Sequence, residues 1–262
     1  MNQTNDKNEL NLFYEKYSKD FADLALFYNI NNFPNLSLKD KISVLAHKLK
    51  AEKRFNFAGF LFDKLFTTFL SMNALINKIE CLIAVGKLEK ALHFNDIAFE
   101  LFLEMEDVGN IENVEKALAY QKAKIYFLSS NFVQTSHICE NYIVKAKQKR
   151  FFTLFCATLI VQGDFNNAEK LLKRFHNQIH NFLAETILHL ASINRITNFA
   201  DFIKSTKNLR INNMQTLITN IEVLTGGDEE IQLVDKILKQ EIIFLGNTSK
   251  SALTTEVVQC KE

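Results

Sequence analysis

The chain has 262 residues, 47% of them hydrophobic, and a formal net charge of +1. One Pro and seven Gly leave little material for turns, which argues against an all-β fold and against long linkers. The small net charge gives no general indication of binding to nucleic acid or to an anionic membrane. Four cysteines without a CxxC pair or a regular spacing favour reduced thiols in the cytosol over a disulfide framework.

The first predicted element is an amphipathic helix over residues 8–28, because its apolar residues recur mostly every three or four positions. No basic and apolar signal pattern opens the chain, so we expect a cytoplasmic protein without a signal peptide. An irregular apolar loop follows the helix. Such a loop can insert shallowly into a membrane interface, on the cytosolic face in this case, or it can pack on the first repeat. The loop residues proposed for membrane contact are Phe27, Tyr28, Ile30 and Phe33.

Helices separated by short turns are expected along the rest of the chain. The Asn-rich segment 29–35 contains the only Pro, and Ser37 is the expected N-cap of the next helix. Gly86 and Gly163 lie where one helix gives way to the next, which suits residues that accept positive φ. The expected helices span about 38–52, 54–70, 72–85, 88–105, 113–129, 132–147, 150–162, 165–178, 181–194, 198–206, 211–224 and 229–244.

A short pattern recurs in this series, an aromatic residue or Leu followed three positions later by a small residue. The leading residues are 33, 44, 33 and 34 positions apart. A period near 34 is the length of the tetratricopeptide repeat. The five instances are Phe55 with Ala58, Leu88 with Ala91, Phe132 with Thr135, Phe165 with Ala168 and, degenerately, Phe199 with Phe202.

The sequence therefore predicts an all-α fold, a right-handed tetratricopeptide-like α-solenoid of antiparallel helix pairs with C-terminal capping helices. Small residues such as Ala46, Ala123 and Cys156 are expected where the first helix of a pair crosses the second. The 44-residue interval requires extra residues around 105–114 or longer flanking helices. We expect one solenoid domain over 1–245, with pairs at about 38–70, 72–105, 113–147, 150–178 and 181–206, C-terminal helices over 211–244 and a mobile tail over 246–262.

No motif of a known catalytic site occurs, whether a phosphate loop, GxGxxG, GxSxG or HExxH. His176 and His180 have the spacing of two metal ligands on one helix face, but no third ligand follows at a recognised spacing, so a structural role is favoured. The acidic residues around Glu104 fit a solvated helix end. We expect a non-enzymatic protein without metal or cofactor. A metal-dependent enzyme using the two histidines is the enzymatic alternative.

Two groups of basic residues suggest a binding surface. If they project from one face of the solenoid, they would attract an acidic partner and speed its docking. The alternative is that they are scattered, solvated lysines. One group is Lys145, Lys147, Lys149 and Arg150, and the other, one helix earlier, is Lys116, Lys122 and Lys124.

Four segments resemble, in order, segments of the α-SNAP-type adaptor family. Residues 54–65 carry its Ala-Gly-x-x-Phe pattern, and residues 98–108 are similar to its Ala-Ile-x-Ile-aromatic segment, after which the family also has a long repeat. Residues 162–172 resemble its Gln-Tyr-x-x-Ala turn, with extra residues after the Gln, and residues 225–233 resemble its Gly-Asp-x-Glu-x-Leu segment. The resemblance covers about residues 20–240.

The resemblance implies an adaptor that covers the acidic SNARE bundle with a concave basic face and recruits the NSF ATPase for its disassembly in vesicle fusion and protein transport. In that role the loop with Phe27 and Phe33 would touch the membrane, and Arg150 matches a basic position of the family. Lys116 and Lys122 lie near another.

The C-terminus departs from the family pattern. It lacks the Trp and the acidic, Leu-containing tail that engage the ATPase, so any coupling would fall to other residues such as Asp228, Glu229 and Glu230. The alternative function is a generic tetratricopeptide scaffold that binds a peptide in its groove. That alternative predicts Asn and Lys side chains converging on one peptide-sized slot.

Overall fold

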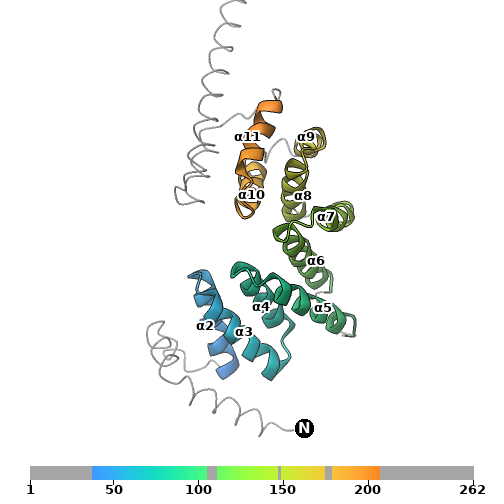
Figure 1. Ribbon diagram of the computed structural model, residues 1–262. Coiled ribbons are helices and arrows are strands. Elements are labelled where there is room, and N and C mark those ends of the chain that lie inside the picture. The colour runs from blue at the N-terminus through green and yellow to red at the C-terminus, as the bar shows by residue number, and fades with distance from the viewer. Residues whose placement is uncertain (1–36, 105–110, 147–148, 175–178, 207–262) are drawn as a thin grey trace, which may run out of the picture. The chain divides into compact units, whose positions relative to one another are not determined.

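The computed structural model describes residues 37–104, 111–146, 149–174 and 179–206. Within these ranges every regular element is an α-helix, as the sequence predicts (Figure 1). The predicted helices over 8–28 and 211–244 and the tail lie outside the described residues. The helices are α2 (Leu38–Ala51), α3 (Phe55–Phe69), α4 (Met72–Ala84), α5 (Leu88–Glu104), α6 (Ile111–Leu128), α7 (Phe132–Ala146), α8 (Lys149–Val161), α9 (Phe165–Lys173), α10 (Ile179–Ala191) and α11 (Ile196–Ser205).

The chain divides into two compact units, Met1–Ile125 (unit 1) and Tyr126–Glu262 (unit 2). In unit 1, α3 packs between α2 and α4, and α4 also packs on α5. In unit 2, α8 packs on α7, α9 and α10, and α10 also packs on α11. Helices joined by short turns pack as antiparallel neighbours, so unit 1 contains the tetratricopeptide-like pairs α2–α3 and α4–α5, and unit 2 contains the pairs α8–α9 and α10–α11. The single domain over 1–245 stays a prediction.

The same turn joins the two helices of every described pair. Its central residue has a positive φ, between 55° and 76°, and the five positions are 33, 44, 33 and 31 residues apart. The backbone N–H of the next residue donates to the carbonyl five residues before it, for example Arg54 N to Leu49 O at 2.9 Å and Asn131 N to Tyr126 O at 2.8 Å. This is the six-residue bond of a Schellman turn, which ends a helix sharply. The central residues are Lys53, Gly86, Ser130, Gly163 and Asn194.

The Schellman turns correct the register of the fifth pair. In the first four pairs the leading residue of the pattern lies two positions after the positive-φ residue, as Phe165 follows Gly163. In the fifth pair the positive-φ residue is Asn194, so Ile196 leads and not Phe199. The hydrophobic pattern was misleading because Ile196, Phe199 and Phe202 are all buried and share one helix face.

The predicted crossing points are confirmed. The small residues that follow the leading positions in the first four pairs, Ala58, Ala91, Thr135 and Ala168, have no exposed surface. Ala46, Ala123 and Cys156 on the first helices are also buried. Side chains of this size let two helices approach closely, and a larger side chain there would have to displace its neighbours.

Two predicted boundaries change in the structure. Helix α9 ends at Lys173, five residues before the predicted end, and no Gly or Pro in the sequence marks this position. The long interval between the second and third pairs is partly taken up by longer helices, because α5 has 17 residues and α6 has 18, against 15 and 13 in α3 and α4. In the described part of the chain, no helix is long and apolar enough to cross a bilayer.

Candidate functional site

Polar side chains gather in unit 1 on α2, α4 and the second half of α6. Lys39, Ser43 and His47 recur every four residues on α2, so they lie on one face of the helix. They line a small cavity of about 60 Å³ together with Asn73 of α4. We call the whole group the unit 1 polar track, which consists of Lys39, Ser43, His47 and Lys50 of α2, Asn73, Asn77 and Glu80 of α4, and Gln121 and Lys124 of α6.

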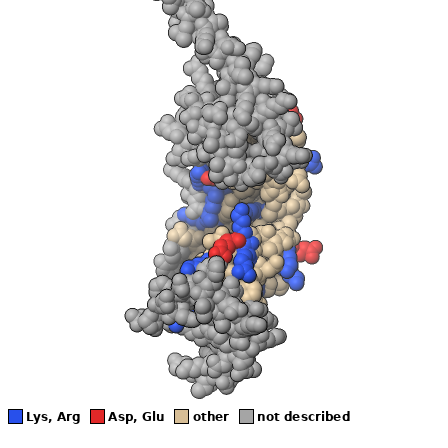
Figure 2. Space-filling model, turned by 90° about the vertical axis from the view of Figure 1, so that its left-hand side faces the viewer, with Lys and Arg blue, Asp and Glu red and all other residues tan. Residues whose placement is uncertain are grey.

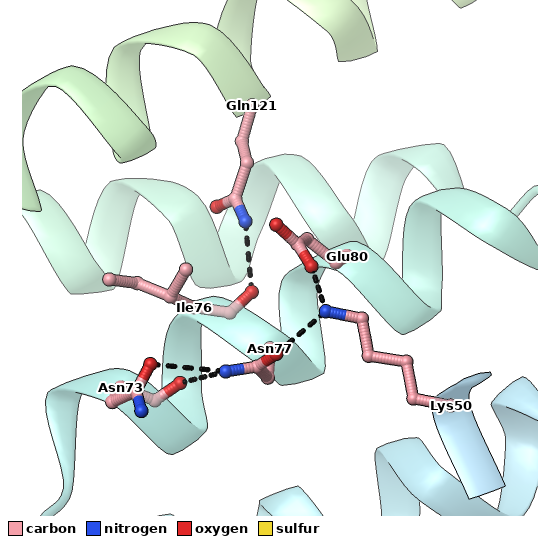
Figure 3. Close-up of polar contacts among 6 residues, drawn as sticks. All are labelled: Lys50, Asn73, Ile76, Asn77, Glu80 and Gln121. Atoms are coloured by element: carbon pink, nitrogen blue, oxygen red, sulfur yellow. Dashed lines mark hydrogen bonds and ion pairs between the residues drawn. The ribbon is translucent and has the colours of Figure 1, made fainter. Parts of the chain in front are cut away.

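Lys50 connects α2 to α4 at the centre of the track (Figure 3). Its Nζ donates to Asn77 Oδ1 at 2.7 Å and forms an ion pair with Glu80. Asn77 Nδ2 donates in turn to the backbone carbonyl of Asn73 at 2.8 Å. The side chains of Lys50 and Glu80 keep 26% and 45% of their surface exposed, so the pair is accessible to a ligand.

Helix α6 adds an amide and an ammonium group to the track. Gln121 Nε2 donates to the carbonyl of Ile76 in α4 at 2.9 Å (Figure 3). Its Oε1 is buried and accepts no hydrogen bond from the described residues. A buried acceptor without a donor costs desolvation free energy, which a donor from a ligand or a water molecule would recover.

Burial sets the electrostatics of the track. Burial lowers the pKa of Lys124, and the nearby Glu80 carboxylate opposes part of this effect. Partial burial and the Lys50 ammonium lower the pKa of His47, against a smaller opposite effect of Glu80. One carboxylate therefore faces two lysines, and the ammonium of Lys124 has no ion pair among the described residues. A second carboxylate from a partner would stabilise this half-buried charge.

The described cysteines do not supply a nucleophile. Burial raises the pKa of Cys81 to about 11 and that of Cys156 to about 12. Burial raises the pKa of Cys139 even further. A thiol with such a pKa is almost fully protonated at neutral pH and is therefore unreactive.

The predicted basic residues of unit 1 separate into different environments. Lys122 Nζ forms an ion pair with Asp96 at 2.8 Å, so its charge is already balanced. Lys116 is half-buried on α6. Lys124, which the sequence placed in the same group, lies near Glu80 in the track.

The predicted basic residues of unit 2 are also engaged where the structure describes them. Lys149 Nζ lies 2.5 Å from a carboxylate oxygen of Glu185, and the Arg150 guanidinium lies 5.8 Å from the ring centre of Phe151. On the face drawn in Figure 2, the blue Lys and Arg side chains have red Asp and Glu side chains among them. Lys145 belongs to α7, but its side chain lies outside the described residues, as does Lys147. That these residues form one basic binding face stays a prediction.

Other predicted sites lie outside the described residues. They are the loop residues Phe27, Tyr28, Ile30 and Phe33, the acidic residues Asp228, Glu229 and Glu230, and the side chains of His176 and His180. Within the described ranges, no group of three His, Cys, Asp or Glu side chains is placed to hold a metal ion.

Most residues of the unit 1 polar track were not predicted from the sequence. Its hydrogen bonds join residues 27 and 45 positions apart, so no local motif reports them. One signal was present, because Asn73, Asn77 and Glu80 recur at helical spacing in a helix whose other residues are mostly apolar. Polar residues on one face of the first helix of a pair are a usable indicator of such a surface.

Comparisons with known proteins give a limited result. No protein-family model matches the chain, and no curated protein sequence matches it. Among solved structures, a tetratricopeptide repeat protein from Parabacteroides merdae is similar at 13% sequence identity and a TM-score of 0.49. The match covers 90% of this chain and 99% of that protein. The fold assignment rests on the helix pairs and the repeated Schellman turn.

Proposed function

We propose that the chain is a protein-interaction scaffold that holds a segment of a partner protein along the unit 1 polar track. The observation that carries the proposal is the set of hydrogen bonds by which Lys50, Asn77 and Gln121 join α2, α4 and α6, with the Lys124 ammonium near Glu80. Each of these helices is the first of its pair and is fixed by buried crossing residues such as Ala46 and Ala123. A rigid framework of this kind positions polar groups with little entropy left to lose on binding.

The chemistry of the track favours a peptide segment with an acidic side chain. The exposed Asn73 amide is a group that exchanges hydrogen bonds with a peptide backbone. Asn77, whose amide is already bonded at both ends, and the buried Gln121 hold the helices that carry the track in place. The Lys124 ammonium is desolvated and lacks a carboxylate of its own, so it selects for a negative charge. Glu80 already forms an ion pair with Lys50, so the positive charge of Lys124 remains. This charge favours a partner segment that carries a negative charge.

A selection from displayed peptides tests this proposal. Random peptides of about 12 residues, which span about 40 Å when extended, are selected against the full chain. We expect the selected peptides to share an acidic position and to bind Lys124→Met about tenfold more weakly, because a charge-assisted hydrogen bond is lost. Lys90→Met, which removes an exposed lysine of α5, is the matched control and should bind like the wild type. Selected peptides without a shared acidic residue, or with equal affinity for Lys124→Met, would overturn the proposal.

The SNARE adaptor role is a narrower form of this scaffold function, and it rests on the ordered resemblance of residues 54–65, 98–108, 162–172 and 225–233. In the adaptor role, the predicted basic residues contact the SNARE bundle. Among them, Lys149 and Arg150 give the clearest test. Their reversal to Glu should weaken binding of an assembled SNARE bundle, with Lys90→Glu as the control. A bundle that does not bind, or that ignores the reversal, would leave only the peptide scaffold.

A further inference from the structure

Unit 2 contains an open cleft that the unit 1 polar track does not explain. The cleft has a volume of about 380 Å³ and lies where α7, α8 and α9 meet. Its apolar lining comes from all three helices, with Ile143 of α7, Phe155 and Leu159 of α8, and Leu171 of α9. Ile143 and Phe155 keep part of their surface exposed, so apolar area is available for a ligand to cover.

Two cations at the C-terminal end of α9 border this cleft. Lys170 and Arg174 both line it, and they lie one helical turn apart. Neither side chain has an ion pair or a hydrogen bond among the described residues, whereas the neighbouring Lys173 pairs with Glu169 at 2.6 Å. Lys170 and Lys173 lie in the last turn of α9 and Arg174 is its C-cap, so all three cations interact favourably with the helix dipole. The dipole therefore does not explain why Lys170 and Arg174 flank an apolar cleft without partners.

The acidic residues of the cleft do not neutralise these cations. Asp164 caps α9, because its side chain accepts hydrogen bonds from Asn167 N at 3.3 Å and from Asn167 Nδ2 at 2.7 Å. Glu140 lies on α7 and forms no ion pair with either cation. The cleft thus has a basic edge at the C-terminal end of α9, while its two acidic residues lie at the N-terminus of α9 and on α7.

We propose that this cleft binds an amphipathic helical segment of a partner protein. The apolar side chains of the segment enter between α7 and α9, and its acidic side chains face Lys170 and Arg174. Charge complementarity fixes the orientation, because an acidic flank turned toward α7 would meet Glu140.

A helical ligand fits better than an extended one. The cleft walls are helices whose backbone groups are already hydrogen-bonded, so they offer no backbone partners to an extended segment, whose N–H and C=O groups would depend on water and side chains. A helix satisfies these groups internally and presents apolar residues on one stripe. Helix α9 has nine residues and is about 13.5 Å long, which matches two to three turns of such a segment.

Three synthetic peptides test the proposal against the full chain. The first is a helix of about 14 residues, or roughly four turns, with Leu at positions i, i+4 and i+7 and Glu along one flank of this stripe. The second carries Lys in place of Glu, and the third carries Ser in place of Leu. Binding is measured by fluorescence anisotropy. We expect the Glu peptide to bind and the Lys and Ser peptides to bind at least about tenfold more weakly.

Variants of the cleft make the test specific. Lys170→Glu combined with Arg174→Glu should weaken the Glu peptide about tenfold or more and make the Lys peptide the better ligand, because two attractions become repulsions. Lys173→Glu changes a charge on the same helix outside the cleft and should alter affinity less than about twofold. Circular dichroism of each variant checks that the helices remain folded.

Several results would overturn the proposal. These are equal binding of the Glu and Lys peptides, no reversal of preference in the double variant, or no binding of any peptide. Sedimentation of the chain alone provides a second check. Self-association that the double variant abolishes would assign the cleft to a second copy of the chain instead of a partner helix. Because the cleft lies in unit 2, these outcomes are independent of the peptide selection at the unit 1 polar track.

Discussion

The Nζ atom of Lys50 lies 2.7 Å from Oδ1 of Asn77, although the two residues are 27 positions apart and belong to different helix pairs. The contact joins the first helix of one pair to the first helix of the next. It places polar side chains on a surface whose helices are otherwise held together by apolar residues such as Leu45 and Leu75. The proposed function begins from this contact.

Removing the ammonium of Lys124 should leave the fold intact. In Lys124→Met the buried stem remains and the desolvated charge is lost, so we expect a free energy of unfolding equal to the wild type or higher by up to about 1 kcal/mol at pH 7. Urea unfolding measures it, with Lys90→Met as the control. A loss of more than about 2 kcal/mol would show that Lys124 holds the fold together and is not a group kept for binding.

The lowered pKa of Lys124 predicts how the stabilities of the wild type and Lys124→Met differ with pH. The unfolded chain binds a proton more tightly than the folded one, so stability rises as the pH increases from the folded pKa toward about 10.4, the unfolded value. Between pH 7 and pH 10, the free energy of unfolding of the wild type should therefore rise relative to that of Lys124→Met. The difference between the two proteins is the quantity to follow, because other groups titrate equally in both. A constant difference would contradict the assigned environment of Lys124.

The Schellman turns predict stabilising glycine substitutions. Ser130 has φ 60°, a conformation that glycine adopts without the steric cost of a Cβ atom. Ser130→Gly should raise the free energy of unfolding by about 0.5–1 kcal/mol. Ser129→Gly, one position earlier with ordinary φ, is the control and should not stabilise. The reverse change, Gly163→Ala, should destabilise by about 1 kcal/mol, because φ is +76° even though its Cβ would meet no neighbour.

The crossing point in the fourth pair predicts a large effect from a small enlargement. Ala168 has no exposed surface, so Ala168→Leu should overpack the pair and cost about 1–3 kcal/mol. Asn166→Leu adds the same side chain at an exposed position of α9 and should change stability by less than about 0.5 kcal/mol. Thermal unfolding compares the two. Equal midpoints would mean that the repeat register is wrong.

Lys78 predicts a measurable coupling in the core of unit 1. Its Nζ lies 2.6 Å from an Asp63 carboxylate oxygen and 3.2 Å from the ring centre of Phe94, and only 10% of its side chain is exposed. Asp63→Asn should destabilise by about 1–2 kcal/mol, because it leaves a buried ammonium with a weaker partner. In a double-mutant cycle with Lys78→Met, we expect a coupling energy of about 1 kcal/mol. Additive effects would show that the pair contributes nothing to stability.

Much of the helix-pair architecture could be predicted from the sequence, because a repeat places the same local signals at a fixed interval. The pattern that begins at Phe55 and Leu88 gave the helix order, and glycines marked the turns at Gly86 and Gly163. The leading residue of the fifth pair was predicted wrongly for two reasons. Its positive-φ residue is Asn194, which is a weaker turn signal than glycine, and three buried apolar residues follow it.

The candidate site could be predicted less well. A charge cluster in the sequence does not report which lysines are already paired, and Lys122 and Lys124 differ in this respect although they are two residues apart. The contacts of Lys50 and Gln121 depend on how successive helix pairs pack, which is a property of the folded chain.

The affinity of a selected acidic peptide for the wild type and for Lys124→Met tests the central claim most directly. Isothermal titration at neutral pH gives both dissociation constants, with Lys90→Met as the control. The scaffold proposal predicts about tenfold weaker binding to Lys124→Met and unchanged binding to Lys90→Met. Equal affinity for all three proteins would contradict it, because the unit 1 polar track would then take no part in recognition.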